Sequence, residues 1–188
     1  PPGGASDSLA RLLADKLPEQ LKQQVIVENR PGVGGRLAAQ AVKTAAPNGT
    51  TYMIAPNATF TFQHLTYTVK ELGYDMNTDF TSVAQLTSYP MAMVVSSSIG
   101  VKNAKDYVSW AKANPGKVFY GSVGTGSTAH MAGELLKQSA GFEMTVVPFK
   151  GTPEVYAAML SGSVHAAFDN YLVPKPMIDA GKLRLPAV

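Results

Sequence analysis

Short segments rich in β-branched residues alternate with stretches of helical spacing along this chain, and this alternation most constrains the fold. Residues 7–23 repeat leucine at helical intervals, and residues 25–29 follow as a short strand. A second helix is expected over 36–46, stopped by the turn signal at 47–49, before a strand at 52–55. A strand–helix rhythm with short connections predicts a mostly parallel sheet with helices on both faces.

The same alternation of predicted strands and helices occurs in the second half of the chain. Strands are expected at 91–95, 118–122, 144–148 and 164–168, and helices over 103–113, over 129–139 up to Gly141, and from Pro153. Residues 96–100 are mostly small and suit a crossover between the halves. The sequence therefore predicts an α/β fold of two lobes, 1–98 and 99–188, whose last strand (about 182–188) returns toward the first lobe. One continuous doubly wound domain is the alternative.

The composition argues against several classes of function. The 188 residues are 45% hydrophobic and 15% charged, as in an ordinary globular protein. The net charge is only +3 and no run of Lys or Arg occurs, so nucleic-acid binding has little support. The sequence has no cysteine, which excludes disulfides, thiolate metal sites and a cysteine nucleophile. No apolar run approaches the roughly 20 residues that span a bilayer.

The strongest local signal for chemistry is the glycine- and serine-rich turn at 121–128, between a predicted strand and a predicted helix. Its three glycines let backbone N–H groups approach a ligand, and its serines and threonines add hydroxyl donors. The free N–H groups and the dipole of a helix N-terminus favour an anion, so the turn predicts a phosphate or carboxylate site. The candidate binding residues in it are Ser122, Gly124, Thr125, Gly126 and Ser127.

A flexible loop that merely caps the helix is the competing interpretation of this turn. Its position after a strand and before a helix favours binding. The glycine spacing departs from the dinucleotide fingerprint G-x-G-x-x-G, and no lysine follows as it does in the P-loop of nucleotide hydrolases.

A second glycine-rich turn opens the first helix and supplies Gly3, Gly4 and Ala5 as candidate ligand contacts. We expect Asp7 to be the N-cap of that helix. Alone, this turn indicates no more than capping. Together with the turn at 121–128 it predicts two helix starts that face each other across a cleft, at the C-terminal ends of strands.

Four further residues complete the predicted site: Lys150 at a third helix start, Asn57 and Thr59 in the loop after the 52–55 strand, and Asp169 at the end of the 164–168 strand. Lys150 would pair with a ligand carboxylate, and Asp169 would recognise an amine or hydroxyl group. A solvated surface lysine and a structural cap are the alternatives for these two.

Catalysis has little support in the sequence. His64, His130 and His165 form no recognisable Ser/His/Asp arrangement, and no G-x-S-x-G nucleophile elbow occurs. His130 and Glu134 lie four apart on one helix face, but without a third ligand a hydrogen-bonded pair is favoured over a metal site. We expect no catalytic residue, metal or cofactor.

A series of short strings runs through the chain in a familiar order. They are PGGASD at 2–7, VENRPGVGG at 27–35, APNG at 46–49, YD at 74–75, DF at 79–80, ANPGK at 113–117, YGSVGTGS at 120–127 with His130 and Glu134 after it, VPFKG at 147–151 and GKLR at 181–184. In these strings the chain resembles the tripartite tricarboxylate transporter substrate-binding proteins, also called Bug receptors. ENRPGVGG and YGSVGTGS are the most specific.

The resemblance implies a periplasmic receptor with a type II periplasmic-binding-protein fold, whose two lobes close at a hinge on a small carboxylate or a related acid or amide. It implies that the turns at Gly3-Gly4-Ala5 and Ser122 to Ser127 hold a ligand carboxylate, partly through ordered water. The loaded receptor would dock on the permease subunits of a membrane transporter. We interpret Arg11, residues 28–30 and residues 34–35, which also match, as supporting the fold.

The chain departs from the family at its ends. We expect a signal peptide and first strand upstream and the completion of the first lobe downstream, so the fold is expected to be incomplete at both ends. Pro186 also removes a hydrogen-bond donor from the last strand. Two other functions stay open: an α/β enzyme that uses the 121–128 turn as a phosphate or oxyanion site, and a protein-interaction module without a small ligand.

Overall fold

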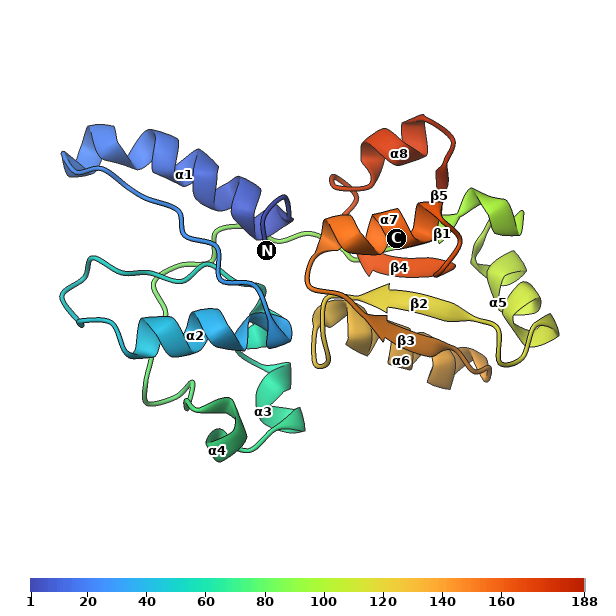
Figure 1. The fold of residues 1–188 in the computed structure, drawn as a ribbon, viewed down its shortest axis with the longest axis horizontal. Coiled ribbons are helices and arrows are strands. Elements are labelled where there is room, and N and C mark those ends of the chain that lie inside the picture. The colour runs from blue at the N-terminus through green and yellow to red at the C-terminus, as the bar shows by residue number, and fades with distance from the viewer. Residues whose placement is uncertain (188) are drawn as a thin grey trace.

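The computed structural model describes residues 1–187, which form two parts (Figure 1). The N-terminal part, residues 1–80, consists of helices and extended segments. Its helices are α1 (Ala5–Leu21), α2 (Arg36–Lys43), α3 (Phe62–Thr66) and α4 (Val69–Leu72), with short 3-10 turns at Val33–Gly35 and Asn57–Thr59. Residues 81–91 are extended and lead into the second part.

The second part is built on a five-stranded sheet with the strand order β3-β2-β4-β1-β5. The strands are β1 (Ala92–Ser96), β2 (Phe119–Ser122), β3 (Thr145–Pro148), β4 (Ala166–Asp169) and β5 (Leu183–Ala187). β2 runs parallel to β3 and β4, whereas β1 runs antiparallel to β4 and β5. The sheet is therefore mixed, not mostly parallel as predicted.

Helices cover both faces of this sheet, as its residue pattern requires. They are α5 (Ala104–Ala113), α6 (Thr128–Ala140), α7 (Thr152–Leu160) and α8 (Lys175–Asp179). Successive strand side chains point to opposite faces, so Met93 and Val95 of β1 pack in a core with α5 and α6. Val94, between them, packs in a second core with α7. All three valine and methionine side chains are buried, which makes β1 an interior strand.

The crossover between the two parts lies earlier than predicted. The strand expected at 91–95 forms, but it pairs with β4 and β5 in the sheet of the second part. Residues 96–100, expected to be the crossover, instead contain a 3-10 turn at Ser97–Ile99 that follows β1. The extended segment 81–91 connects the parts, because the buried apolar run of β1 belongs inside a sheet and the exposed run before it does not.

The last strand lies at the edge of the same sheet, beside β1, and pairs with no strand of residues 1–91. Its register shifts between Met93 and Val95, which face Ala187 and Arg184 respectively. Pro186 falls within this irregular stretch of an edge strand, where a missing N–H donor is tolerated. Val188, the end of the expected strand, lies outside the described residues.

The two strands predicted in the first half do not form. Residues 25–29 and 52–55 are extended, but no ladder partner pairs with either among residues 1–187. Ile26 and Tyr52 are 82% and 65% exposed. A segment with strand propensity forms a strand only when a neighbouring strand pairs with its backbone groups. Residues 25–29 and 52–55 are extended, as their propensity predicts, but they lack such a neighbour among residues 1–187.

The predicted helices form with shifted ends. The helix expected over 7–23 begins at Ala5 and ends at Leu21, and the helix expected over 36–46 ends at Lys43. The helix expected to stop at Gly141 does so, because Gly141 takes the left-handed C-cap conformation at φ 63°. Pro153 lies in the first turn of α7, as predicted.

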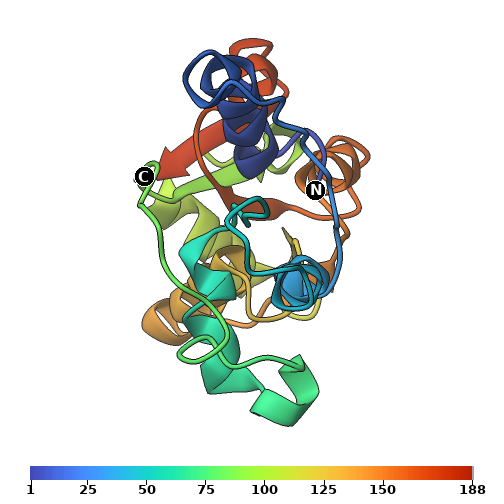
Figure 2. The ribbon, with the colours of Figure 1, turned by 90° about the vertical axis from the view of Figure 1, so that its left-hand side faces the viewer.

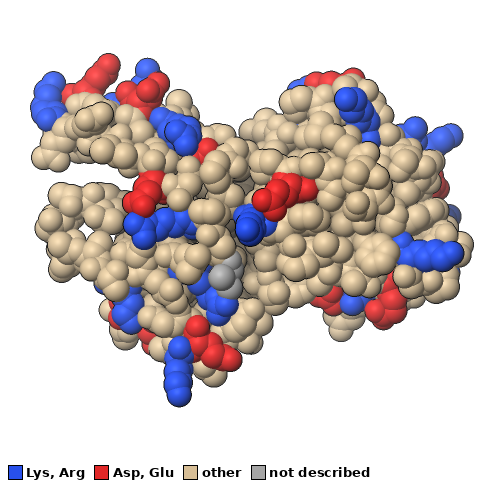
Figure 3. Space-filling view, in the orientation of Figure 1, with Lys and Arg blue, Asp and Glu red and all other residues tan. Residues whose placement is uncertain are grey.

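The surface carries charges of both signs without a large patch of either on the face in Figure 3. No helix within residues 1–187 has the length and apolar character needed to cross a membrane.

Gly133 of α6 is tightly packed against Tyr120 of β2, and a Cβ at this position would overlap the tyrosine ring. We expect Gly133→Ala to destabilise the protein by about 1–3 kcal/mol, because overpacking outweighs the gain of about 1 kcal/mol in helix propensity. Urea unfolding measures the change. Ser139→Ala, at an exposed position of the same helix, is the control and should leave the unfolding midpoint nearly unchanged. Equal stability of Gly133→Ala and wild type would contradict the packing.

Candidate functional site

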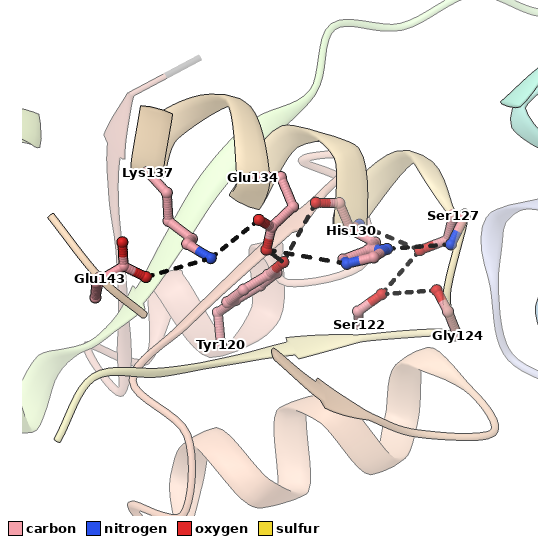
Figure 4. A network of polar contacts seen from close by, with 9 residues as sticks. Tyr120, Ser122, Gly124, Ser127, His130, Glu134, Lys137 and Glu143 are labelled. Carbon is pink, nitrogen blue, oxygen red and sulfur yellow. Dashed lines mark hydrogen bonds and ion pairs between the residues drawn. The ribbon is translucent and has the colours of Figure 1, made fainter. Parts of the chain in front are cut away.

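The turn between β2 and α6 is held by two serine hydroxyls (Figure 4). Ser122 is 1% exposed, and its hydroxyl donates to the carbonyl of Gly124 at 3.1 Å and lies 2.8 Å from the Ser127 hydroxyl. Ser127 is the N-cap of α6, where its oxygen accepts the backbone N–H of His130 at 3.2 Å. Both hydroxyls therefore fix the turn in this structure.

Two glycines of the turn adopt backbone angles that other residues avoid, with φ 108° at Gly124 and 78° at Gly126. The N–H of Gly126 donates to Nδ1 of His130 at 3.1 Å, and the N–H of Ser127 donates to the Gly124 carbonyl at 3.3 Å. Thr125, between the glycines, is exposed. Gly124 and Thr125 therefore lie at the tip of the turn, and hydrogen bonds fix the residues on either side of them.

A cavity of about 410 Å³ lies between the two parts of the molecule at this turn. It is lined by Gly32 and Tyr67 from the N-terminal part and by Gly124, Thr125, Pro148, Phe149, Lys150 and Glu154 from the second part. Three of the predicted site residues, Gly124, Thr125 and Lys150, line it together. The lining carries an ammonium, a carboxylate, a hydroxyl and exposed backbone, which suits a small polar ligand.

A buried glutamine builds the opposite side of the contact between the parts. Gln63 is 1% exposed; its Nε2 donates to the Gly34 carbonyl at 2.6 Å and its Oε1 accepts the Tyr74 hydroxyl at 2.9 Å. The Thr59 hydroxyl donates to the same carbonyl at 3.1 Å. A Cβ on Gly34 would lie 3.3 Å from the Thr125 carbonyl, so the parts approach closely here. Thr59, a predicted ligand residue, is buried and supports Gly34.

The N-terminal turn is arranged differently from the prediction. Gly4, not Asp7, is the N-cap of α1. Asp7 lies in the first turn of the helix, where its carboxylate accepts the Gly3 N–H at 2.9 Å, Nε of Arg11 at 3.1 Å and Nδ2 of Asn29 at 2.9 Å. These hydrogen bonds lower the pKa of Asp7 to about 2. Arg11 and Asn29, interpreted as supporting the fold, thus hold the loop before α2 to α1.

This turn lies beside the start of α7 and not in the lining of the 410 Å³ cavity. A Cβ on Gly3 would lie 3.4 Å from Pro153, and one on Gly151 would lie 3.0 Å from Pro1. Figure 2 shows the N-terminus next to α7. The ligand-binding role of Gly3, Gly4 and Ala5 stays a prediction.

Asp169 and Asn57 also lie outside that lining. The Asp169 carboxylate accepts the Tyr156 hydroxyl at 3.0 Å and, from Asn170, the backbone N–H at 2.8 Å and the side-chain amide at 3.0 Å. Burial raises the pKa of Asp169. Asn57 is exposed at the start of the 3-10 turn, whose other two residues are buried. Asp169 therefore acts here as a structural acceptor at the end of β4.

Sequence reasoning missed two polar side chains of the cavity, Glu154 and Tyr67, as well as Gly32, Pro148 and Phe149. Glu154 lies in the first turn of α7, where its carboxylate accepts the backbone N–H of Lys150 at 3.1 Å. The spacing of four from Lys150 was a usable signal for Glu154. Tyr67 carries the guanidinium of Arg36 over its ring at 4.3 Å, and nothing in the sequence pattern marked it.

A second hollow, of about 440 Å³, lies at the far end of α6. Glu134 and Glu143 line it, with Lys137 between their carboxylates at 3.0 and 3.6 Å. Its one cation is already paired with two carboxylates, so this hollow suits an anion poorly. The cavity between the parts is the better candidate.

His165 and His130 have structural contacts. Nδ1 of His165 accepts the Phe119 N–H at 3.2 Å, the ring packs on Trp110, and burial lowers the pKa of His165. Nε2 of His130 lies 3.9 Å from the Glu134 carboxylate. Among residues 1–187, His, Asp and Glu side chains nowhere gather in threes that would hold a metal ion.

Comparison with known proteins decides the family. The sequence model of the tripartite tricarboxylate transporter family receptor matches residues 9–188. The chain belongs to this receptor family. A curated relative, the "UPF0065 protein in gbd 5'region" of Cupriavidus necator, is 38% identical over 97% of this chain and 54% of its own length.

Two solved structures of Rhodopseudomonas palustris proteins resemble this family member closely. Rpa4515 with adipate has a TM-score of 0.92 at 36% identity, and covers 98% of this chain and 61% of its own. MatC with bound malate has a TM-score of 0.90 at 28% identity, and covers 99% and 63%. The chain therefore spans about half of the curated relative and about three fifths of these structures.

In this receptor family member, Asp7 accepts hydrogen bonds from Gly3 and Arg11 at the start of α1, and its bond with Asn29 ties α1 to the loop before α2. We expect Asp7→Asn to lower the free energy of unfolding at pH 7 by about 1–3 kcal/mol, because hydrogen bonds to a charged acceptor are lost. The pKa of Asp7 in the folded protein, about 2, lies below the 3.8 of a free aspartate side chain, so this stabilisation is present above pH 3.8 and disappears as the pH falls toward 2.

Urea unfolding of wild type and variant at several pH values measures the difference, which should shrink below pH 4. Asp15→Asn, an exposed position of the same helix, is the matched control and should change little. A difference between Asp7→Asn and wild type that is independent of pH would contradict this role of Asp7.

Proposed function

We propose that this chain is the ligand-binding portion of an extracytoplasmic, periplasmic receptor that captures a small carboxylate and delivers it to the permease subunits of a membrane transporter. The observation that carries the proposal is the cavity between the two parts, where the Gly124-Thr125 turn and Lys150 meet Tyr67. Membership of the receptor family supports the transport role.

The cavity has the chemistry that a carboxylate needs. Lys150 brings an ammonium group, and α6, 13 residues long, begins directly behind the turn and directs its positive dipole end toward it. Thr125 adds a hydroxyl donor. Charge-assisted hydrogen bonds contribute about 1.5–3 kcal/mol each, so several of them together offset the cost of ordering the ligand.

The solved relatives support a small carboxylate as the ligand class. One was solved with adipate and the other with malate, and each is a dicarboxylate of few carbon atoms. The Gly/Ser turn, the α6 start and Lys150 are compatible with either.

Hydrogen bonding in the turn favours a receptor over an enzyme. Ser127 receives the backbone N–H of His130, while the imidazole Nδ1 accepts from Gly126. The two serine hydroxyls contact each other, and within residues 1–187 neither forms a hydrogen bond with an imidazole nitrogen. An enzyme that used this turn would need such a base.

We propose that the two parts belong to two lobes, with the boundary near residue 91 instead of 98 and the segment 81–91 as one of their connections. Gly34 and Thr125 lie close together in this arrangement, and opening at the hinge would separate them. The solved relatives are longer than this chain, and the extended segments 25–29 and 52–55 have exposed side chains and no partner strand among residues 1–187. We propose that further chain pairs with them to complete the first lobe.

Calorimetric titration with a panel of mono-, di- and tricarboxylates, including adipate and malate, tests the function. It should be run on residues 1–188 and on the complete product of the gene. We expect saturable binding of at least one acid. Absence of heat with every acid, from folded complete protein, would overturn the proposal.

Lys150→Met should weaken binding of the best acid by about tenfold or more, because it removes a charge-assisted contact while keeping the length of the side chain. Lys117→Met, at an exposed turn after α5, removes the same charge away from the cavity and is the control. If both variants lose affinity equally, the effect is one of net charge and Lys150 does not contact the ligand.

A further inference from the structure

His130 holds the glycine/serine turn from behind. Its Nδ1 accepts the N–H of Gly126 at 3.1 Å, and its own backbone N–H donates to the cap residue Ser127. Figure 4 shows His130 beside the turn, on the first turn of α6. The side chain is only 16% exposed, so this hydrogen bond is shielded from water.

The backbone of His130 is tied to β2 as well. The buried Tyr120 hydroxyl donates to the carbonyl of His130 at 3.3 Å and to Oε1 of Glu134 at 3.0 Å. Oε1 of Glu134 lies 3.9 Å from Nε2 of His130, which is beyond hydrogen-bond distance. The neutral tautomer with its proton on Nε2 leaves Nδ1 free to accept from Gly126.

We propose that His130 is a positioning residue that keeps the turn in its ligand-binding shape only while Nδ1 is unprotonated, so that protonation of His130 weakens carboxylate binding. The inference rests on the proposed function. A proton on Nδ1 turns the acceptor into a donor that faces the Gly126 N–H, and the hydrogen bond is lost. Gly126 directly follows Thr125, so a change at its amide reaches the cavity lining.

A shift of the turn would also disturb its packing against the N-terminal part. A Cβ on Gly126 would lie 3.6 Å from Gln63 and 3.9 Å from Tyr67, and Tyr67 lines the cavity. Gly126 is buried against these side chains at φ 78°. A turn released by His130 would therefore lose its fit to both the ligand and the N-terminal part.

The charged and titratable groups that face His130 come from α6 and β2. On α6, Glu134 faces Nε2 and is itself paired with Lys137, which also reaches Glu143. From β2 comes Tyr120, whose pKa is raised by burial and by Glu134.

Two variants of nearly equal size separate the acceptor from the bulk of the side chain. His130→Asn places an oxygen on Cγ where histidine has Nδ1, so it can accept from Gly126 but does not titrate. His130→Leu has the same branching and no acceptor. We expect adipate and malate affinities of His130→Asn to stay within about twofold of wild type at pH 8, and those of His130→Leu to fall about tenfold.

The pH profile distinguishes positioning from packing. Wild-type affinity should fall between pH 8 and 5.5, and the affinity of His130→Asn should not, apart from any part due to protonation of the acid itself, which both proteins share. Equal pH profiles of wild type and His130→Asn, or wild-type affinity in His130→Leu, would overturn the inference.

An NMR measurement without ligand tests the hydrogen bond independently of the binding function. The imidazole nitrogens of His130 should show the Nε2–H tautomer at pH 8. The protection factor of the Gly126 amide, its exchange relative to an unstructured chain at the same pH, should be high in wild type and His130→Asn at pH 8, and at least tenfold lower in His130→Leu and in wild type at pH 5.5. Equal protection of the Gly126 amide in wild type at both pH values and in both variants would contradict the inference. If neither acid binds to any of the proteins while the amide behaves as expected, the proposed function fails for these acids and the positioning role stands.

Discussion

The hydrogen bond between the hydroxyls of Ser122 and Ser127 joins the end of β2 to the start of α6, and the candidate site depends on it. Both residues are nearly buried, so the bond forms where water does not compete. It commits both hydroxyls to the turn, with Ser127 also capping α6. The chain between them bulges outward as Gly124 and Thr125, which line the cavity between the two parts.

Packing between β2 and α6 keeps this turn in place. β2 lies between β3 and β4, and its Tyr120 is fully buried against α6 at Gly133. The tyrosine hydroxyl reaches the same helix at His130 and Glu134. Strand, turn and helix therefore form one hydrogen-bonded unit, and a ligand bound at the turn would meet donors that are already oriented. The N-terminal part contributes a wall instead, built around the Gln63 amide and the Gly34 carbonyl.

Helix positions could be read from the sequence because their signals are local. Leucine spacing, Pro153 and Gly141 act within a few residues, and α1, α6 and α7 form close to where these signals put them. Strands at 25–29 and 52–55 could not be decided in this way, since a strand needs a partner that may lie anywhere in the chain. The place of β1 in the sheet of the second part could not be decided from the sequence for the same reason, because its partners are β4 and β5.

The sequence by itself determined the receptor family, the glycine/serine turn between a strand and a helix, and the lysine at the start of α7. Each is carried by consecutive residues whose local chemistry does not depend on distant neighbours. Only the tertiary structure decided which of the predicted residues share a cavity. It united Gly124, Thr125 and Lys150 with Tyr67, and it buried Thr59 and Asp169 in structural hydrogen bonds. The physical reason is that a polar side chain binds whichever partner folding places beside it, and the sequence pattern does not contain that distance.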